Sequence, residues 1–432
     1  MTRLGILQPL IIPALALALV PPGAPAVPHV ALASGAATAP SGVGLRPGET
    51  PVRIRTLSLP GRLVEHAPRL RSTHPLPLDS AEQVAVTWAA GQPAPQVEIR
   101  TRAAARWSTW EAVQPLEDGE ASEGNGTAGS DLAWVGHRSD VQIRVRGALP
   151  RGLSAVLIDP GHRDADADPR AASTPDAPEP GAPTHDASTQ DASTYGGAVP
   201  AAYRLAADTT TSTTYHDTVL DSPPKTTFPT PHAPRPFIYT RHAWNADESL
   251  RPNPPEYSLT ISQVHLHHTV STNSYTRSEV PAMIRGMYSY HVKTLGWNDI
   301  GYNFLVDRFG RIWEGRYGGI TYPVRGAHTL GFNHRSVGIS VIGNFETAKP
   351  TDALLSSVAR LAAWKLDLYG RPASGTTSRT SEGSDLYPNG EVVRLPVFDG
   401  HRDTNQTACP GRYLYARLPD LRRWAQRIEN QY

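Results

Sequence analysis

Three histidines lie within four positions of the stretch "VHLHHTV", which covers residues 264–270. Imidazole nitrogen is a ligand that zinc accepts readily, so this stretch is a candidate for metal binding. Its apolar and β-branched residues predict a β-strand, along which successive side chains point to opposite faces. His265 and His267 therefore share one face and His268 points to the other, so that geometry alone leaves His265 and His267 as competing ligands.

A second candidate for metal binding, "FDGHRDTNQTACPGRY", lies near the C-terminus and contains His401 and Cys409, the only cysteine of the chain. The two residues are 409 minus 401, or 8, positions apart in a segment whose Gly, Asp, Thr and Asn residues predict a loop. A catalytic zinc ion usually has three protein ligands and one open position, and two histidines with this thiolate would supply three. The spacing differs from that of a zinc finger, and the alternative is a loop histidine beside a core cysteine.

The N-terminus predicts export from the cell. One positive charge is followed by the apolar run "LGILQPLIIPALALALV" and by the small-residue sites "APA" and "ALA", as in a signal peptide over residues 1–33. The alternative is an uncleaved membrane anchor, but Pro9 and Pro13 interrupt the run. We therefore expect a secreted protein with no stable membrane insertion. A single cysteine forms no internal disulfide, so Cys409 is a buried bystander, an intermolecular link or a functional thiolate.

Length and composition predict several domains and no nucleic-acid partner. A chain of 432 residues exceeds one ordinary domain, and a net charge of +1 lacks the basic excess of most nucleic-acid-binding proteins. Residues 161–235 are rich in Pro, Ala, Ser, Thr and Asp and predict a disordered linker. This linker separates a β-rich domain at 50–160 from a C-terminal domain at 236–432.

The β-rich domain is predicted from short segments of alternating apolar residues such as "QVEIRT" and "VQIRVR", which are typical of antiparallel strands in a small sandwich. Its tryptophans are predicted to point inward into the sandwich core, with a carbohydrate site as the alternative. They are Trp88, Trp107, Trp110 and Trp134.

The C-terminal domain mixes strand and helix signals, which predicts an α/β fold with a mixed central sheet flanked by helices. Helices are expected over 278–296 with Ser278 as N-cap, over 351–370, and over 413–428 with an interruption at Pro419. The second of these helices has an apolar stripe at helical spacing, formed by Leu354, Leu355, Val358, Leu361 and Ala362. A strand–turn–strand hairpin is expected around residues 308–310.

Four ordered motifs between about residues 241 and 411 resemble the peptidoglycan recognition protein family, the type 2 N-acetylmuramoyl-L-alanine amidases. The motifs are "HLHHTV", "GWNDIGYNFLVDRFGRIWEGR", "GAHTLGFNHRSVGISVIGNF" and "GHRDTNQTACPGR". The resemblance covers the C-terminal domain only. It implies a Zn²⁺ enzyme that hydrolyses the amide bond between the lactyl group of N-acetylmuramic acid and L-alanine in peptidoglycan.

The resemblance also implies site residues. The metal ligands of catalytic members correspond to His267, His401 and Cys409, which leaves His265 as a neighbour of the site. The tyrosine of "DIGYNF", Tyr302, corresponds to a residue that stabilises the attacked carbonyl, and Thr407 matches a position that assists at the oxyanion.

Other motif positions are candidates for substrate contacts: Trp297, Arg316, Tyr317, His328 and Asn333. Many relatives have Gly-Trp where this chain has Tyr317-Gly318, so a stem-peptide preference cannot be transferred. Some relatives also carry a glutamate on the strand that reads "VGIS" here, and the general base therefore stays unassigned.

Two other classes of function compete with a secreted, cell-wall-associated amidase that acts as a monomer. A binding module would keep the fold and recognise peptidoglycan without cutting it. The presence of Cys409 and Tyr302 favours the enzyme, because non-catalytic relatives commonly lack the metal cysteine. An interaction protein is the third class, in which the β-rich domain binds a wall polymer, another protein or the amidase domain.

Overall fold

The computed structural model describes residues 45–116, 124–170, 219–224 and 231–431. The predicted signal peptide at 1–33 and most of the predicted linker lie outside the described residues. Within the part of the chain that is described, no helix has the length and apolar character needed to cross a membrane. Residues Ser41–Tyr432 belong to one compact unit.

The β-rich region contains two antiparallel sheets that pack face to face, as alternating apolar residues require. One sheet has the strand order β1-β12-β5-β10, with β9 also paired to β5. The other has the order β2-β3-β11-β6-β7, with β4 paired to β11 and β8 to β6. The strands are β1 (Arg53–Ser58), β2 (Leu63–Ala67), β3 (Leu70–Thr73), β4 (Leu76–Pro77), β5 (Gln83–Ala89), β6 (Gln96–Ala103), β7 (Arg106–Trp107), β8 (Glu111–Val113), β9 (Thr127–Gly129), β10 (Ala133–Trp134), β11 (Asp140–Arg146) and β12 (Ser154–Asp159).

The prediction that all four tryptophans fill the sandwich core is wrong for two of them. Trp88 and Trp134 are buried, with 4% and 5% of their surface exposed. Trp107 and Trp110 are only half-buried and lie against arginine side chains. Trp107 lies in the two-residue strand β7, which pairs with β6, and Trp110 lies in the segment between β7 and β8.

The C-terminal region contains a six-stranded mixed sheet, which confirms the predicted α/β class. Its order is β13-β16-β15-β17-β14-β20, and the pairs are parallel except for the β15–β16 hairpin. The strands are β13 (Ile238–Tyr239), β14 (Gln263–His268), β15 (Phe304–Val306), β16 (Ile312–Glu314), β17 (Ser336–Val341) and β20 (Phe398–Gly400), with a separate hairpin of β18 (Thr376–Thr380) and β19 (Val392–Pro396). The helices are α1 (Val280–Ser289), α2 (Asp352–Asp367), α3 (Arg412–Tyr415) and α4 (Leu418–Gln431).

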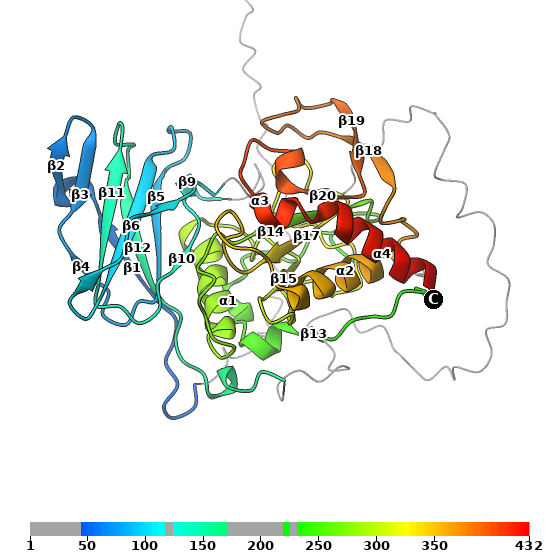
Figure 1. Ribbon diagram of the computed structural model, residues 1–432, viewed down its shortest axis with the longest axis horizontal. Helices are drawn as coiled ribbons and strands as arrows, with labels where there is room; N and C mark the ends of the chain where they lie inside the picture. Colours follow the sequence, from blue (N-terminus) through cyan, green and yellow to red (C-terminus); the bar gives the residue numbers. More distant parts are fainter. Residues whose placement is uncertain (1–44, 117–123, 171–218, 225–230, 432) are drawn as a thin grey trace, which may run out of the picture. The chain divides into compact units, whose positions relative to one another are not determined.

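Helices cover both faces of this sheet. Helices α2 and α4 pack together and bury one face, to which strand β14 contributes Val264 and Leu266 (Figure 1). Because strand side chains alternate, His265 and His267 point to the opposite face. The apolar stripe predicted for α2 is buried as expected, and Thr351 caps this helix by accepting a hydrogen bond from the backbone N–H of Leu354.

The predicted start of the first helix is wrong. Helix α1 begins at Val280 with Glu279 as its N-cap residue, and a π-helical turn, Tyr290–Thr294, follows it. Ser278 does not cap the helix, because the carboxylate of Glu279 instead accepts hydrogen bonds from the backbone N–H and the hydroxyl of Thr276. The predicted C-terminal helix is divided into α3 and α4 just before Pro419, as expected from the missing N–H of proline.

The β-rich region and helix α1 share one hydrophobic cluster. Ala85, Val156 and Ile158 project from the outer face of the β1-β12-β5-β10 sheet and pack with Ile284 and other residues of α1. The closeness of this contact explains Gly286, since a Cβ atom there would lie 1.5 Å from Oε1 of Gln83.

Polar contacts join the same surfaces. The amide of Gln83 donates to the carbonyl of Met283 at 3.1 Å. The buried guanidinium of Arg285 donates to both carboxylate oxygens of Asp166, at 2.6 and 2.7 Å. Asp166 lies in a short 3₁₀ turn, Asp164–Asp166, so the first residues of the range predicted to be linker are folded against helix α1.

Candidate metal centre

Three side chains from distant parts of the sequence meet beside the central sheet. His267 comes from strand β14, His401 begins the 3₁₀ turn that follows β20, and Cys409 lies in the next loop. Strands β14 and β20 are parallel neighbours, and their register places Leu266 beside Gly400, so the next residue of each strand lies at the same edge. One ligand atom from each of the three residues lies within 4.8 Å of the others.

The distance between the His267 and Cys409 ligand atoms fits one tetrahedral ion. Nδ1 of His267 lies 3.7 Å from Sγ of Cys409. Zinc–nitrogen and zinc–sulfur bonds of about 2.0 and 2.3 Å at a tetrahedral angle would separate the two atoms by about 3.5 Å. The donor set of two imidazoles and one thiolate is also one that zinc accepts, with a fourth position left for water or substrate.

The protonation of the two imidazoles suits this role. Burial lowers the pKa of His267 well below its usual range, and the neighbouring His401 and His328 add to this effect. Burial likewise lowers the pKa of His401 to about 3. Both rings are therefore neutral near pH 7, as metal ligands must be.

His328 contacts the ring of His267 on the side opposite to Cys409. Its Nδ1 lies 3.1 Å from Nε2 of His267, which leaves Nδ1 of His267 to face Cys409. The backbone N–H of His328 donates to the side-chain oxygen of Asn333 at 2.7 Å, and this contact fixes the loop. Gly326 and Gly338 make room for the His328 ring, because a Cβ atom on either glycine would lie 2.4 Å from it.

His265 has a different environment from His267. It is fully buried, and its Nδ1 lies 2.6 Å from Oδ1 of Asp399. The register between β14 and β20 places these two residues directly opposite each other. The structure therefore brings His267 to Cys409, whereas His265 is engaged by a carboxylate. His268, on the other face, accepts a hydrogen bond at Nδ1 from the backbone N–H of Phe345.

The two residues predicted to assist catalysis lie near the three candidate ligands. Tyr302 is buried, and its ring centroid is 5.5 Å from that of His267. The hydroxyl of Thr407 accepts a hydrogen bond from the backbone N–H of Cys409 at 3.2 Å, which positions the loop that carries the thiol. The roles of Tyr302 and Thr407 stay predictions.

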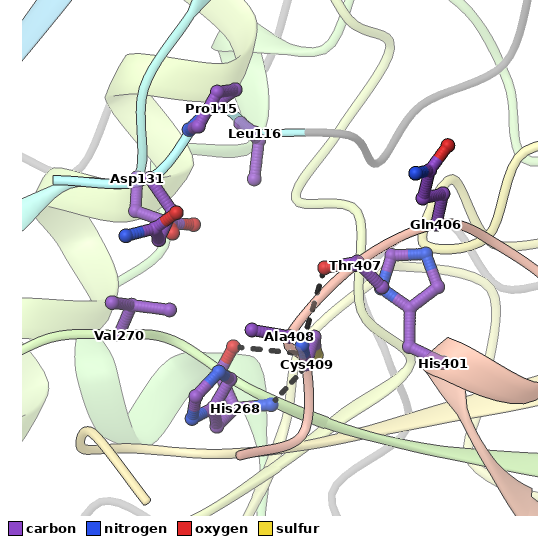
Figure 2. A pocket seen from close by; sticks show the side chains of 11 residues that line it. Pro115, Leu116, Asp131, His268, Val270, His401, Gln406, Thr407, Ala408 and Cys409 are labelled. Carbon is purple, nitrogen blue, oxygen red and sulfur yellow. Dashed lines mark hydrogen bonds between the residues drawn. The ribbon is translucent and has the colours of Figure 1, made fainter. Parts of the chain in front are cut away.

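A pocket of about 220 Å³ opens beside Cys409 (Figure 2). Figure 2 shows Thr407, Cys409 and His401 on one side of it, and Leu116 and Asp131 on the other. Eleven residues line this pocket: Gln114, Pro115, Leu116, Asp131, His268, Val270, His401, Gln406, Thr407, Ala408 and Cys409. The first four come from the β-rich region, and the sequence motifs had given no indication of them.

The predicted substrate-contact residues do not line this pocket. The side chains of Trp297, Arg316 and Tyr317 are between 5% and 7% exposed, and those of His328 and Asn333 are fully buried. Trp297 packs on the ring of His291 with a centroid separation of 4.4 Å, and the guanidinium of Arg251 stacks 3.7 Å from the ring of Tyr317. Their contact with substrate stays a prediction.

Comparison with known proteins gives two family matches. Residues 257–412 match the family described as N-acetylmuramoyl-L-alanine amidase (Amidase_2). Residues 79–184 match the family described as Rv3811 N-terminal galactose-binding domain-like. The first match contains all three candidate ligands, and the second covers most of the β-rich region.

Individual relatives match the C-terminal region over most of their own length. Peptidoglycan-recognition protein SC2 of Drosophila simulans is 29% identical over 164 residues, which are 38% of this chain and 76% of the relative. A second peptidoglycan-recognition protein of the same species is 30% identical over 187 residues, which are 43% of this chain and 88% of the relative. A solved structure of peptidoglycan recognition protein LE in complex with tracheal cytotoxin is 32% identical, covering 42% of this chain and 92% of that one, with a TM-score of 0.34. The chain therefore belongs, through its C-terminal region, to the peptidoglycan recognition protein family.

Proposed function

We propose that this protein is a secreted, zinc-dependent N-acetylmuramoyl-L-alanine amidase that acts on the bacterial cell wall. The bond cleaved is the amide between the lactyl group of N-acetylmuramic acid and L-alanine of the stem peptide. The observation that carries this proposal is the meeting of His267, His401 and Cys409 beside a pocket that His401 and Cys409 line. A module that only recognised peptidoglycan would have no need of three metal-binding side chains in this arrangement.

Each residue of the site has a separate role in this proposal. His267, His401 and Cys409 hold a zinc ion, which when bound polarises the substrate carbonyl and lowers the pKa of a water molecule. Tyr302 donates a hydrogen bond to the carbonyl oxygen as negative charge develops on it, and the loss of one such donor typically costs about 3 kcal/mol. Thr407 holds the loop of Cys409 and is the second candidate to assist at this oxygen.

The proposed substrate class agrees with the names of the relatives. The two Drosophila simulans proteins described above are named for the recognition of peptidoglycan. The substrates to be tested include peptidoglycan fragments whose stem peptides contain diaminopimelic acid and fragments whose stem peptides contain lysine.

The test uses the full mature chain, purified peptidoglycan and mass spectrometry of the soluble products. We expect release of intact stem peptides with new L-alanine amino termini, loss of this release in a zinc chelator, and its recovery when zinc is added back. Cys409→Ala should abolish release, and added zinc should not restore it. Release that survives both the chelator and the substitution would refute the zinc mechanism. Binding to the walls without any release would assign the protein to the non-catalytic recognition class.

A further inference from the structure

A groove of about 1100 Å³ continues from the pocket beside Cys409, called the metal pocket below, along the boundary between the β-rich and C-terminal regions. The groove and the pocket share four lining residues, Gln114, His268, Val270 and Ala408. A substrate whose scissile bond lies at Cys409 therefore has a continuous path into this groove. The groove is several times larger than the metal pocket, so it suits an extended ligand.

One wall of the groove carries the two tryptophans that the sandwich core does not use. Trp107 and Trp110 both line the groove and are half-buried. The guanidinium of Arg144 lies 4.3 Å from the ring centroid of Trp110, and that of Arg100 lies 4.6 Å from Trp110 and 4.9 Å from Trp107. These cation–π contacts hold the indole rings in place, so little conformational entropy is lost when a ligand packs on them.

The opposite wall offers amide and hydroxyl groups from the C-terminal region. Thr272, Asn273, Ser274, Asn344 and Thr347 line it. The side-chain amide of Asn273 donates to the carbonyl of Asn344 at 2.9 Å, and its oxygen accepts from the backbone N–H of Asn344 at 3.1 Å. This wall is therefore built from two loops that fix each other.

The groove carries charges of both signs. Glu279 and Glu346 lie on the C-terminal wall, and Arg100, Arg106 and Arg138 lie with Glu111 on the β-rich wall. Because these charges nearly balance, an uncharged ligand with many hydroxyl and amide groups suits the groove.

We propose that this groove binds the glycan strand of peptidoglycan on one side of the muramic acid whose amide is cut. N-acetylated sugar rings have apolar faces that pack on indole, and hydroxyl and acetamido groups that bond to asparagine, threonine and serine. The β-rich region thus contributes a glycan subsite to the cleft, with Trp107 and Trp110 as its aromatic platform. This inference rests on the proposed amidase function, since it places a glycan at the reacting bond.

The subsite makes the enzyme favour polymeric substrate over a single muramyl peptide. A muramyl tripeptide occupies only the metal pocket, whereas a glycan strand fills the groove as well. Loss of one aromatic contact costs about fivefold to tenfold in affinity. We therefore expect the ratio of kcat/KM for glycan strands to that for a muramyl tripeptide to fall about fivefold to tenfold in Trp110→Ala, mainly through KM, and to fall further when Trp107→Ala is added.

Two assays separate this inference from the amidase proposal. Binding of peptide-free glycan strands to the Cys409→Ala protein, measured by titration calorimetry, tests the groove without catalysis and should weaken about fivefold to tenfold in Trp110→Ala. Hydrolysis of the muramyl tripeptide by the unsubstituted chain tests the amidase alone. Phe237→Ala is the matched control, because Phe237 is 38% exposed and lines neither the pocket nor the groove. Absence of glycan binding, or an equal loss in Trp110→Ala and Phe237→Ala, would overturn the glycan subsite whatever the result with the tripeptide.

Discussion

Replacing His328 with phenylalanine tests whether the contact between His328 and the candidate ligand His267 contributes to zinc affinity. Nδ1 of His328 lies 3.1 Å from Nε2 of His267, and Nδ1 of His267 faces Cys409. A His267 ring that binds a metal through Nδ1 carries its proton on Nε2, so His328 would accept that N–H. Phenylalanine fills nearly the same volume but accepts no hydrogen bond. The loss of such an outer partner typically weakens metal binding about 10-fold to 100-fold, or about 1.4 to 2.7 kcal/mol.

The change also has a predictable effect on folding. Gly326 and Gly338 leave little free space around the ring, and a slightly larger side chain in a tight core costs about 1 to 3 kcal/mol. His328→Asn is the informative companion, because its side-chain oxygen lies near the position of Nδ1 and keeps the acceptor. We therefore expect zinc affinity to recover in part in His328→Asn, although its smaller side chain leaves a cavity.

The assay is competition for zinc between the protein and a chromogenic chelator, with the unfolding of the metal-free protein followed in urea. His334→Phe is the matched control, since His334 is also a buried histidine but is not among the three candidate ligands. We expect its zinc affinity to equal that of the unsubstituted protein. A zinc Kd for His328→Phe within twofold of this control would refute the role assigned to His328.

Three further changes test the catalytic donor, a buried amine and a buried ion pair. Tyr302→Phe should lower kcat for stem-peptide release about 100-fold to 1000-fold while zinc binding in the chelator assay persists, because the proposed hydrogen bond to the oxyanion is lost and the three candidate ligands are kept. Burial lowers the pKa of Lys365 from 10.5 to about 7. Between pH 7 and pH 10.5 this side chain is therefore protonated in the unfolded chain and largely neutral in the folded one. The free energy of unfolding should therefore rise with pH across that window by up to about 1.4 kcal/mol per unit, and urea titrations of Lys365→Met at several pH values should lack this contribution. Arg285→Met leaves the buried Asp166 carboxylate without its guanidinium and should cost about 3 to 5 kcal/mol in urea unfolding, much of which Arg285→Met with Asp166→Asn should restore.

Features that depend on local sequence were predicted well. The stripe of helix α2 and the break before Pro419 follow from helical spacing and from the proline ring. Ser278 shows the limit of such reasoning, because serine and glutamate are adjacent and both can receive backbone N–H groups. In the structure, Thr276 donates to the carboxylate of Glu279, and helix α1 begins at Val280 without a side-chain cap.

The choice between His265 and His267 needed a contact that spans the sequence. Alternation along strand β14 correctly places both on one face but cannot rank them. What separates them is the register with β20, which sets Asp399 opposite His265 and leaves His267 beside His401 and Cys409. The family resemblance identified His267 because this residue occupies the motif position of a metal ligand in catalytic members. The pattern of residues along strand β14 does not distinguish it from His265.

Neither local sequence patterns nor the family resemblance predicted that the β-rich region lines the pocket beside Cys409. Asp131 and Cys409 line one pocket although they are 409 minus 131, or 278, positions apart, and the resemblance stops short of the β-rich region. The contact depends on an antiparallel β-bridge between Pro115 and Ser130, in which the backbone N–H groups of Leu116 and Asp131 donate to the carbonyls of Gly129 and Gln114, respectively.

The phenol of Tyr290, in the C-terminal region, donates a hydrogen bond to the carbonyl of Ser130 at 3.0 Å and so links this β-bridge to the C-terminal region. Gly129 is required there, since a Cβ atom would lie 2.0 Å from the phenol oxygen. The buried hydroxyl of Tyr290 and Gly129 therefore hold the β-rich region beside the pocket that Asp131 and Cys409 line. In the function proposed above, the C-terminal region supplies the catalytic groups and the β-rich region supplies the surface that binds the glycan, so both regions are needed to form the cleft.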